Sequence, residues 1–156
     1  PPTWKRFTGS GYAWDYEIET LGYKYYMIDI MAAIGLTQMK RLPDLIKKRQ
    51  YIQKIYNKNL HESIQRPLWS HTCQYYSCKV KSDIRNKLID YLNTKNIHTS
   101  VHFKPLHLHP LLKQDRDYPV ADIEWKKSIT LPCHYGMTDD DIDYVIYWTN
   151  KFMDKK

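Results

Sequence analysis

The sequence predicts an α+β domain in which a small three-stranded sheet is covered by helices on one face. Its 156 residues are enough for one hydrophobic core. Segments with helical periodicity alternate with short segments of strand-forming residues, and prolines or glycines separate them. The predicted order is helix, helix, strand, helix, strand, helix, strand, helix.

The first residues are predicted to lack regular structure. Residues 1–26 are assigned to a loop and a short extended segment, punctuated by Gly9-Ser10-Gly11, and residues 27–156 to a small folded domain. A basic, aromatic opening segment without a leading strand or helix is a poor start for an independent domain. We therefore expect the chain to be part of a longer protein.

Two helices are predicted next. The run from Met27 is rich in Ala, Met, Leu and Gln and favours a helix despite Gly35. Pro43 is expected to begin a second helix over about residues 43–60, because proline is tolerated in the first turn of a helix and breaks its interior. The apolar stripe of this helix comprises Leu45, Ile46, Ile52, Tyr56 and Leu60.

The strands are predicted from β-branched and aromatic residues. Residues 74–80 form the first candidate, 99–103 the second and 128–131 the third, which a proline ends. Ser82 is expected to cap a helix that runs to about Asn93. Prolines make the connection between the second and third strands irregular.

The last helix has the clearest boundaries. Thr138 is the predicted N-cap, and Asp139 to Asp141 place carboxylates at the positive end of the helix. Its apolar stripe comprises Ile142, Val145, Ile146, Thr149 and Phe152.

Composition excludes several classes of site and leaves others open. Three cysteines without a CxxC pair argue against a disulfide framework or a cysteine-rich zinc site. His102, His107 and His109 have no carboxylate at ligand spacing, so no metal site is predicted. No Walker-type or GxGxxG loop and no nucleophile elbow is present. No apolar run reaches the ~18 residues of a membrane span and no signal peptide is visible, which predicts a cytoplasmic protein without a membrane partner.

The net charge of +7 permits an anionic partner. Lysines interleaved with tyrosines are typical of single-strand nucleic-acid binding. The cluster Lys47-Lys48-Arg49 is better explained as the solvated face of a helix, so nucleic acid is not expected. A stand-alone basic module that binds nucleic acid or a protein is the alternative function.

Lys24 lies within the segment GYKYYM, directly before a predicted helix. Its ammonium and the backbone N–H groups of the helix N-terminus could hold one phosphate together. Alternatively, its aliphatic stem lies on the tyrosines and the ammonium meets water. Local physics does not choose between these interpretations.

Four blocks of the sequence carry a resemblance to a known family. The blocks are WKRFTGSGYAWDYEIETLGYK, GYKYYMIDIMAAIGLTQMKRLPDLIKKRQYIQKIYNKNL, SVHFKPLHLHP and SITLPCHYGMTDDDIDYVI. In order and spacing they resemble the DegT/StrS family of pyridoxal-phosphate-dependent sugar-nucleotide aminotransferases. The resemblance covers essentially the whole chain.

The resemblance implies the C-terminal domain of a fold type I aminotransferase. Such enzymes are homodimers that transfer an amino group from glutamate to a nucleotide-linked keto sugar in amino-sugar and surface polysaccharide biosynthesis. Their pyridoxal 5'-phosphate is held mainly by an N-terminal domain, which carries the Schiff-base lysine. No lysine here matches that position, so we expect no catalytic residue in this chain and no activity from it alone.

The resemblance also implies site residues. Lys24 matches the position that contacts the cofactor phosphate in the neighbouring subunit, and His102 matches a histidine beside the substrate sugar. Lys104 and His107 are further candidates for substrate contact. Tyr26 stands where the family often has Arg or Asn, and we assign it to the substrate site with that difference noted.

Overall fold

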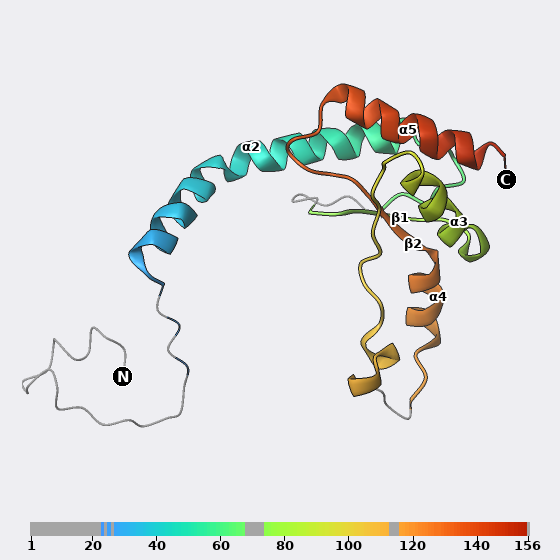
Figure 1. The fold of residues 1–156 in the computed structure, drawn as a ribbon, viewed down its shortest axis with the longest axis horizontal. Coiled ribbons are helices and arrows are strands. Elements are labelled where there is room, and N and C mark those ends of the chain that lie inside the picture. Colours follow the sequence, from blue (N-terminus) through green and yellow to red (C-terminus); the bar gives the residue numbers. More distant parts are fainter. Residues whose placement is uncertain (1–22, 24, 26, 68–73, 113–115, 156) are drawn as a thin grey trace, which may run out of the picture. The chain divides into compact units, whose positions relative to one another are not determined.

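The computed structural model describes residues 23, 25, 27–67, 74–112 and 116–155. The chain divides into two compact units, Pro1–Met39 and Lys40–Lys156, and the core described below belongs to the second. The helices and strands are α2 (Asp29–Asn59), β1 (Tyr76–Lys79), α3 (Ser82–Asn93), α4 (Pro119–Lys127), β2 (Ser128–Leu131) and α5 (Asp139–Met153) (Figure 1). Two short 3-10 turns, η1 (Leu106–Leu108) and η2 (Pro110–Leu112), lie between α3 and α4. The predicted α+β class is confirmed.

Helix α2 is continuous and contains Pro43. The prediction of two helices, with Pro43 at the start of the second, was therefore wrong. A proline removes one backbone donor but keeps a helical φ, and strong helix formers on both sides of Pro43 offset that loss. In the predicted apolar stripe, Ile52, Tyr56 and Leu60 are buried, while Leu45 and Ile46 are half-buried.

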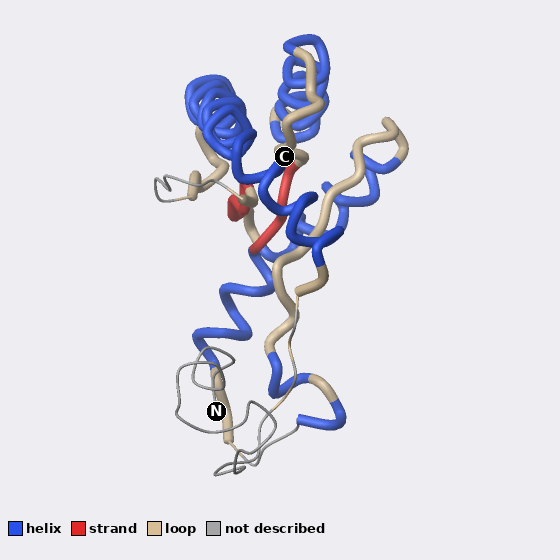
Figure 2. Tube along the Cα trace, turned by 90° about the vertical axis from the view of Figure 1, so that its left-hand side faces the viewer, coloured by secondary structure: helices blue, strands red, loops and turns tan. Residues whose placement is uncertain are grey.

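The sheet consists of β1 and β2, which lie side by side and run antiparallel (Figure 2). Tyr76 pairs with Leu131, Ser77 with Thr130, Cys78 with Ile129 and Lys79 with Ser128. The predicted strand 128–131 is confirmed, and the segment 74–80 contributes the four residues of β1. The candidate strand 99–103 forms only one isolated bridge, between Ser100 and Thr130. Pro132 follows β2 directly and has no N–H with which to extend the ladder.

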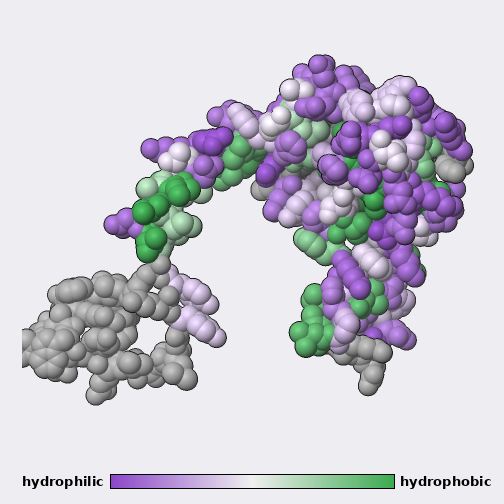
Figure 3. Space-filling view, in the orientation of Figure 1, coloured by the Kyte–Doolittle hydropathy of each residue, from purple (hydrophilic) through white to green (hydrophobic). Residues whose placement is uncertain are grey.

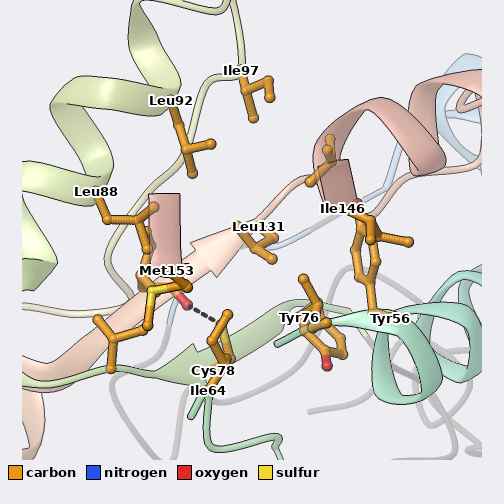
Figure 4. Close-up of a cluster of buried hydrophobic side chains, with 14 of the residues drawn as sticks. Tyr56, Ile64, Tyr76, Cys78, Leu88, Leu92, Ile97, Leu131, Ile146 and Met153 are labelled. Atoms are coloured by element: carbon orange, nitrogen blue, oxygen red, sulfur yellow. Dashed lines mark hydrogen bonds between the residues drawn. The ribbon is translucent and has the colours of Figure 1, made fainter. Parts of the chain in front are cut away.

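One face of the sheet is fully covered. Tyr76, Cys78, Ile129 and Leu131 alternate along the two strands and are at most 2% exposed. Helices α2, α3 and α5 cover them with buried apolar side chains (Figure 4). These side chains are Ile52 and Tyr56 from α2, Ile84, Leu88 and Leu92 from α3, and Ile142, Val145, Ile146 and Phe152 from α5. Burial raises the pKa of the Cys78 thiol to about 12, so this cysteine stays protonated within the core.

Two buried tyrosines join α2 to the sheet. The rings of Tyr56 and Tyr76 meet edge to face with centroids 4.9 Å apart. Tyr56 donates its hydroxyl hydrogen to the carbonyl of Pro132 at 2.9 Å, and Tyr76 donates to Asn57 Oδ1 at 2.7 Å. Burial raises the pKa of Tyr56, so its hydroxyl remains a neutral donor inside the core.

The C-terminus of α2 is closed by Arg66. Its guanidinium donates to the carbonyls of Leu60, His61 and Ile64. Carbonyls at and beyond the last turn of a helix have no intrahelical donors, and one forked side chain satisfies several of them here.

Helix α5 holds the same end of α2 through Asn150. The Asn150 side chain accepts from the His61 backbone N–H at 2.7 Å and donates to the Asn59 carbonyl at 2.8 Å. The long helix is thereby fixed against the last one.

The predicted cap of α5 is confirmed, and that of α3 is wrong. Thr138 accepts from the Asp141 backbone N–H at 3.1 Å, and the Asp141 carboxylate accepts from the Thr138 N–H at 2.8 Å, which forms a capping box. At α3 the N-cap residue is Lys81 and makes no side-chain cap; Ser82 is the first helical residue. The preceding strand fixes where α3 begins.

We predict that Arg66→Ala lowers the free energy of unfolding by about 2 kcal/mol, because several half-buried carbonyls lose their donor. Chemical denaturation of the purified variants measures this change. Arg66→Lys should recover only part of the loss, since a lysine lacks the fork. Arg41→Ala, at an exposed position of α2, is the matched control and should change stability little. Equal stability of the Arg66 and Arg41 variants would contradict the assignment.

The capping box predicts a dependence of stability on pH. Hydrogen bonds from the Thr138 backbone and hydroxyl hold the pKa of Asp141 below its ordinary value of 3.8. The ionised carboxylate therefore stabilises the fold above pH 3.8, and this contribution is lost as the pH falls through the lowered folded pKa. Asp141→Asn should flatten the loss of stability on acidification.

Thermal unfolding between about pH 6 and pH 3 would measure this effect. Asp140→Asn is the matched control, because Asp140 forms no hydrogen bond or ion pair with another residue that the structure describes. If both variants followed the wild-type pH dependence, the proposed role of the Asp141 carboxylate would be wrong.

Candidate functional site

His102 lies against the sheet face opposite the core. Its ring stacks on that of Tyr75, with centroids 4.1 Å apart and planes inclined by 21°. His102 Nδ1 is 3.0 Å from Thr130 Oγ1 in a half-buried hydrogen bond. Phe103 adds a ring whose plane is nearly perpendicular to both.

Strand alternation explains why these residues meet. Tyr76 points into the core, so Tyr75 and Ser77 point to the opposite face. Thr130 pairs with Ser77 and lies on that same face. The bridge from Ser100 to Thr130, with N–H to carbonyl distances of 2.7 and 3.1 Å, then carries His102 to within reach of the Thr130 hydroxyl.

The imidazole of His102 is held but retains one nitrogen for a ligand. Nδ1 is engaged by Thr130, and Nε2 forms no hydrogen bond with another residue among those described. Tyr75 and Phe103 flank it and are 45% and 70% exposed. A polar nitrogen between exposed aromatic rings suits a ligand that has both an apolar face and oxygen acceptors, such as a sugar.

His107, also predicted to contact substrate, has a partner inside the chain. Its Nε2 lies 2.9 Å from Asp122 Oδ1, and its ring lies over that of Tyr118 with centroids 4.8 Å apart. The pair ties η1 to α4. Its predicted contact with substrate stays a prediction, and the geometry gives it a role in holding the segment that follows His102.

An ion cluster holds α4 against β1. The Glu124 carboxylate binds the ammonium groups of Lys79 in β1 and Lys127 at the end of α4. Hydrogen bonds from Lys79 and Lys127 lower the pKa of Glu124, and the bond from Lys79 has the larger effect. This cluster positions the helix that carries Asp122, and through it the η1 segment.

Of the remaining predicted site residues, the structure describes Lys104 but not Lys24 or Tyr26. Lys104 is exposed and forms no hydrogen bond or ion pair with another described residue. Lys24 and Tyr26 lie outside the residues that the structure describes. Their neighbours Tyr23 and Tyr25 are 85% and 84% exposed, and their ring centroids are 5.5 Å apart.

Sequence reasoning missed Tyr75 and Thr130. Thr130 lies in the predicted strand 128–131, which is β2, whereas Tyr75 lies in the predicted segment 74–80 but directly before the residues that form β1. Thr130 lies between two buried apolar residues of β2 and is itself only 6% exposed. A buried hydroxyl needs a hydrogen-bond partner. That requirement was the signal available in the sequence.

The described residues do not fit pyridoxal phosphate by themselves. Two open hollows on the described surface have volumes of about 470 and 490 Å³. The first has no lysine or arginine in its lining, and the lining of the second includes Asp143 and Asp154 as well as Lys151. A phosphate needs cationic or backbone donors that carboxylates do not oppose. Among the described residues no three His, Cys, Asp or Glu side chains gather as a metal site.

Apolar side chains gather over η1 and η2 (Figure 3). Leu106 and Leu111 are 70% and 93% exposed there. Across the described part of the chain, no helix is long and apolar enough to cross a membrane.

The model of the DegT/DnrJ/EryC1/StrS aminotransferase family matches residues 4–148 of the chain. The uncharacterized protein MJ1066 of Methanocaldococcus jannaschii is 38% identical over 96% of this chain and 42% of its own length. The spore coat polysaccharide biosynthesis protein SpsC of Bacillus subtilis is 36% identical over 92% of this chain and 41% of its own. GDP-perosamine synthase of Escherichia coli O157:H7 is 29% identical over 96% and 43%. The chain therefore spans about two fifths of the length of these relatives.

Solved structures show the same fold. The putative sugar aminotransferase Spr1654 of Streptococcus pneumoniae, in its PMP form, superposes with a TM-score of 0.83 and 30% identity over 97% of this chain and 41% of that chain. Its PLP form gives a TM-score of 0.82 and 32% identity over 91% and 40%. The structural neighbours are fold type I aminotransferases, which confirms the predicted fold class.

We predict that Asp122→Ala loosens the η1 segment, because His107 loses its partner. The backbone amides of Leu108 and His109, which bond within the turn, should exchange with solvent about fivefold faster. Hydrogen exchange measured by NMR checks this rate. Asp117→Ala, at an exposed position before α4, should leave both amides unchanged. Unaltered exchange in Asp122→Ala would show that the pair does not hold the segment.

Proposed function

The chain belongs to the DegT/DnrJ/EryC1/StrS aminotransferase family, and we propose that it forms the C-terminal part of an enzyme that aminates a keto sugar carried by a nucleotide. The family match over residues 4–148 is the observation that carries this proposal. Two matched relatives are named for polysaccharide biosynthesis and for the synthesis of a GDP-linked amino sugar. Glutamate is the proposed amino donor.

The cofactor is proposed to be held by another segment of the complete enzyme. The described residues lack a suitable phosphate site, and the chain spans about two fifths of its relatives. We therefore assign the Schiff-base lysine to that other segment and expect no catalytic residue in these 156 residues. When bound, pyridoxal phosphate supplies the electron sink for transamination, and the protein supplies placement and electrostatics.

The proposed contribution of this chain is the sugar side of the site. His102 presents Nε2 between Tyr75 and Phe103, where a sugar oxygen can accept or donate a hydrogen bond. Lys104, which is exposed and follows His102 by two residues, is proposed to contact the substrate, and His107 is proposed to hold the following turn. Tyr26 is assigned to the same substrate site.

Exposed apolar surface supports a larger assembly. In unit Pro1–Met39, large apolar side chains are more than half exposed, namely Met27, Ile28, Ile30, Met31, Ile34, Leu36 and Met39. Contiguous apolar surface of this kind marks an interface. We propose that the remainder of the enzyme and a second subunit cover it, and that Lys24 thereby reaches the cofactor phosphate of the neighbouring subunit. The reaction is proposed to be cytoplasmic, where Cys78 and Cys133 stay as free thiols.

The first test compares the 156-residue chain with the complete enzyme. Pyridoxal phosphate added to the chain alone should give no internal aldimine absorbance, whereas the complete enzyme should show an aldimine band that borohydride abolishes. The complete enzyme should also convert more than one equivalent of glutamate per site to 2-oxoglutarate only when a nucleotide-linked keto sugar is present to take up the amino group. An aldimine on the isolated chain would contradict the proposed division of the site.

Lys24→Ala in the complete enzyme should weaken pyridoxal phosphate binding about tenfold, because the phosphate loses its contact with one ammonium group. Equilibrium dialysis with absorbance detection measures cofactor retention. Lys47→Ala, on the exposed face of α2, is the control and should retain the cofactor as the wild type does. Unchanged affinity and turnover in Lys24→Ala would remove Lys24 from the site.

A further inference from the structure

The Thr130 hydroxyl can both donate and accept a hydrogen bond, but it has one hydrogen-bond partner among the described residues. The residue is 6% exposed, so water has little access to it. Its backbone N–H and carbonyl both bond to Ser100. Among the described residues, the one hydrogen bond that Oγ1 forms is with His102 Nδ1, at 3.0 Å.

The position of the proton follows from this arrangement. If Nδ1–H donated to Thr130, the hydroxyl hydrogen would be left in a buried site without an acceptor among the described residues, which is costly. If the hydroxyl donates to an unprotonated Nδ1, both groups are satisfied. The second arrangement places the ring proton of neutral His102 on Nε2.

We propose that Thr130 is the positioning residue that fixes His102 as a hydrogen-bond donor. With its O–H given to Nδ1, the imidazole carries its proton on Nε2 and directs an N–H toward a ligand. The ligand group it meets is an oxygen acceptor of the substrate: a hydroxyl, carbonyl or phosphate oxygen. His102 in this state has no free lone pair on Nε2 and does not act as a general base.

Tyr75 fixes the orientation of the His102 ring, on which the direction of the Nε2–H depends. A single hydrogen bond to Nδ1 does not by itself fix both side-chain torsions of His102. Stacking on Tyr75, at 4.1 Å and 21°, fixes the plane of the ring. Together the two contacts determine where the Nε2–H points; Thr130 belongs to β2, and Tyr75 directly precedes β1.

The proton position can be measured on the 156-residue chain. Long-range ¹H–¹⁵N spectra of the labelled chain at about pH 8 report which ring nitrogen is protonated in a neutral histidine. His102→Gln identifies the His102 signals by their loss. We expect a protonated Nε2 and an unprotonated Nδ1 whose ¹⁵N shift shows that it accepts a hydrogen bond. A protonated Nδ1 would overturn the proposal.

Variants test whether Thr130 is the cause. Thr130→Val keeps the shape but removes the hydroxyl, so the hydrogen-bond shift of Nδ1 should vanish and the second tautomer should appear. Thr130→Ser should restore the wild-type signals. Thr99→Val is the matched control, because the Thr99 hydroxyl is buried without a hydrogen-bond partner in the described part of the chain. Identical His102 signals in Thr130→Val and wild type would refute the assignment; amide spectra verify that each variant is folded.

The role toward substrate rests on the proposed function and needs the complete enzyme. There Thr130→Val should lower kcat/KM for the nucleotide-linked keto sugar about tenfold, and Thr130→Ser should recover most of it. His102→Gln, whose amide can donate from the place of Nε2, should keep more activity than His102→Ala. Equal loss in these two variants would contradict a donor role for His102.

The outcomes separate the two proposals. Absence of aminotransferase activity in the wild-type complete enzyme would overturn the proposed function and leave the NMR result to decide the state of His102. Full activity together with normal kinetics in Thr130→Val would overturn the positioning role alone.

Discussion

The fold depends on a sheet too narrow to be buried on both faces. Two strands of four residues each offer one apolar face, formed by Tyr76, Cys78, Ile129 and Leu131. Helices α2, α3 and α5 all pack on that face. The Tyr56 and Tyr76 pair, with both hydroxyls satisfied, locks the longest helix to it. A buried tyrosine with a paired hydroxyl adds apolar area and specifies one register.

The same constraint leaves the opposite face for function. With no helix of the core above it, that face receives the chain after Ser100, and the single bridge to Thr130 sets where His102 lies. Lys79, Glu124 and Asp122 then hold α4 and η1 beside the sheet.

Sequence patterns were sufficient where local chemistry decides the structure. The strand β2 has the predicted bounds, and helix α5 has the predicted cap and start, because a cap, an apolar stripe and a terminating proline are local signals. The helix break predicted at Pro43 was wrong because helix formers on both sides outweighed the proline. The strand predicted at 99–103 was wrong because strand formation depends on pairing with a distant strand, and this segment forms a single bridge. His102 was named from motif resemblance, whereas Tyr75 and Thr130 become visible only when the strands are paired. Lys24 and Tyr26 lie outside the described residues.

A crystal structure of the complete enzyme with a nucleotide-linked amino sugar bound would test the central claim most directly. The account predicts a sugar or phosphate oxygen about 2.7–3.2 Å from His102 Nε2, with the sugar beside Tyr75 and with Nδ1 still paired to Thr130. A bound nucleotide sugar that touches no residue of these 156, or a His102 ring turned away from it, would contradict the account.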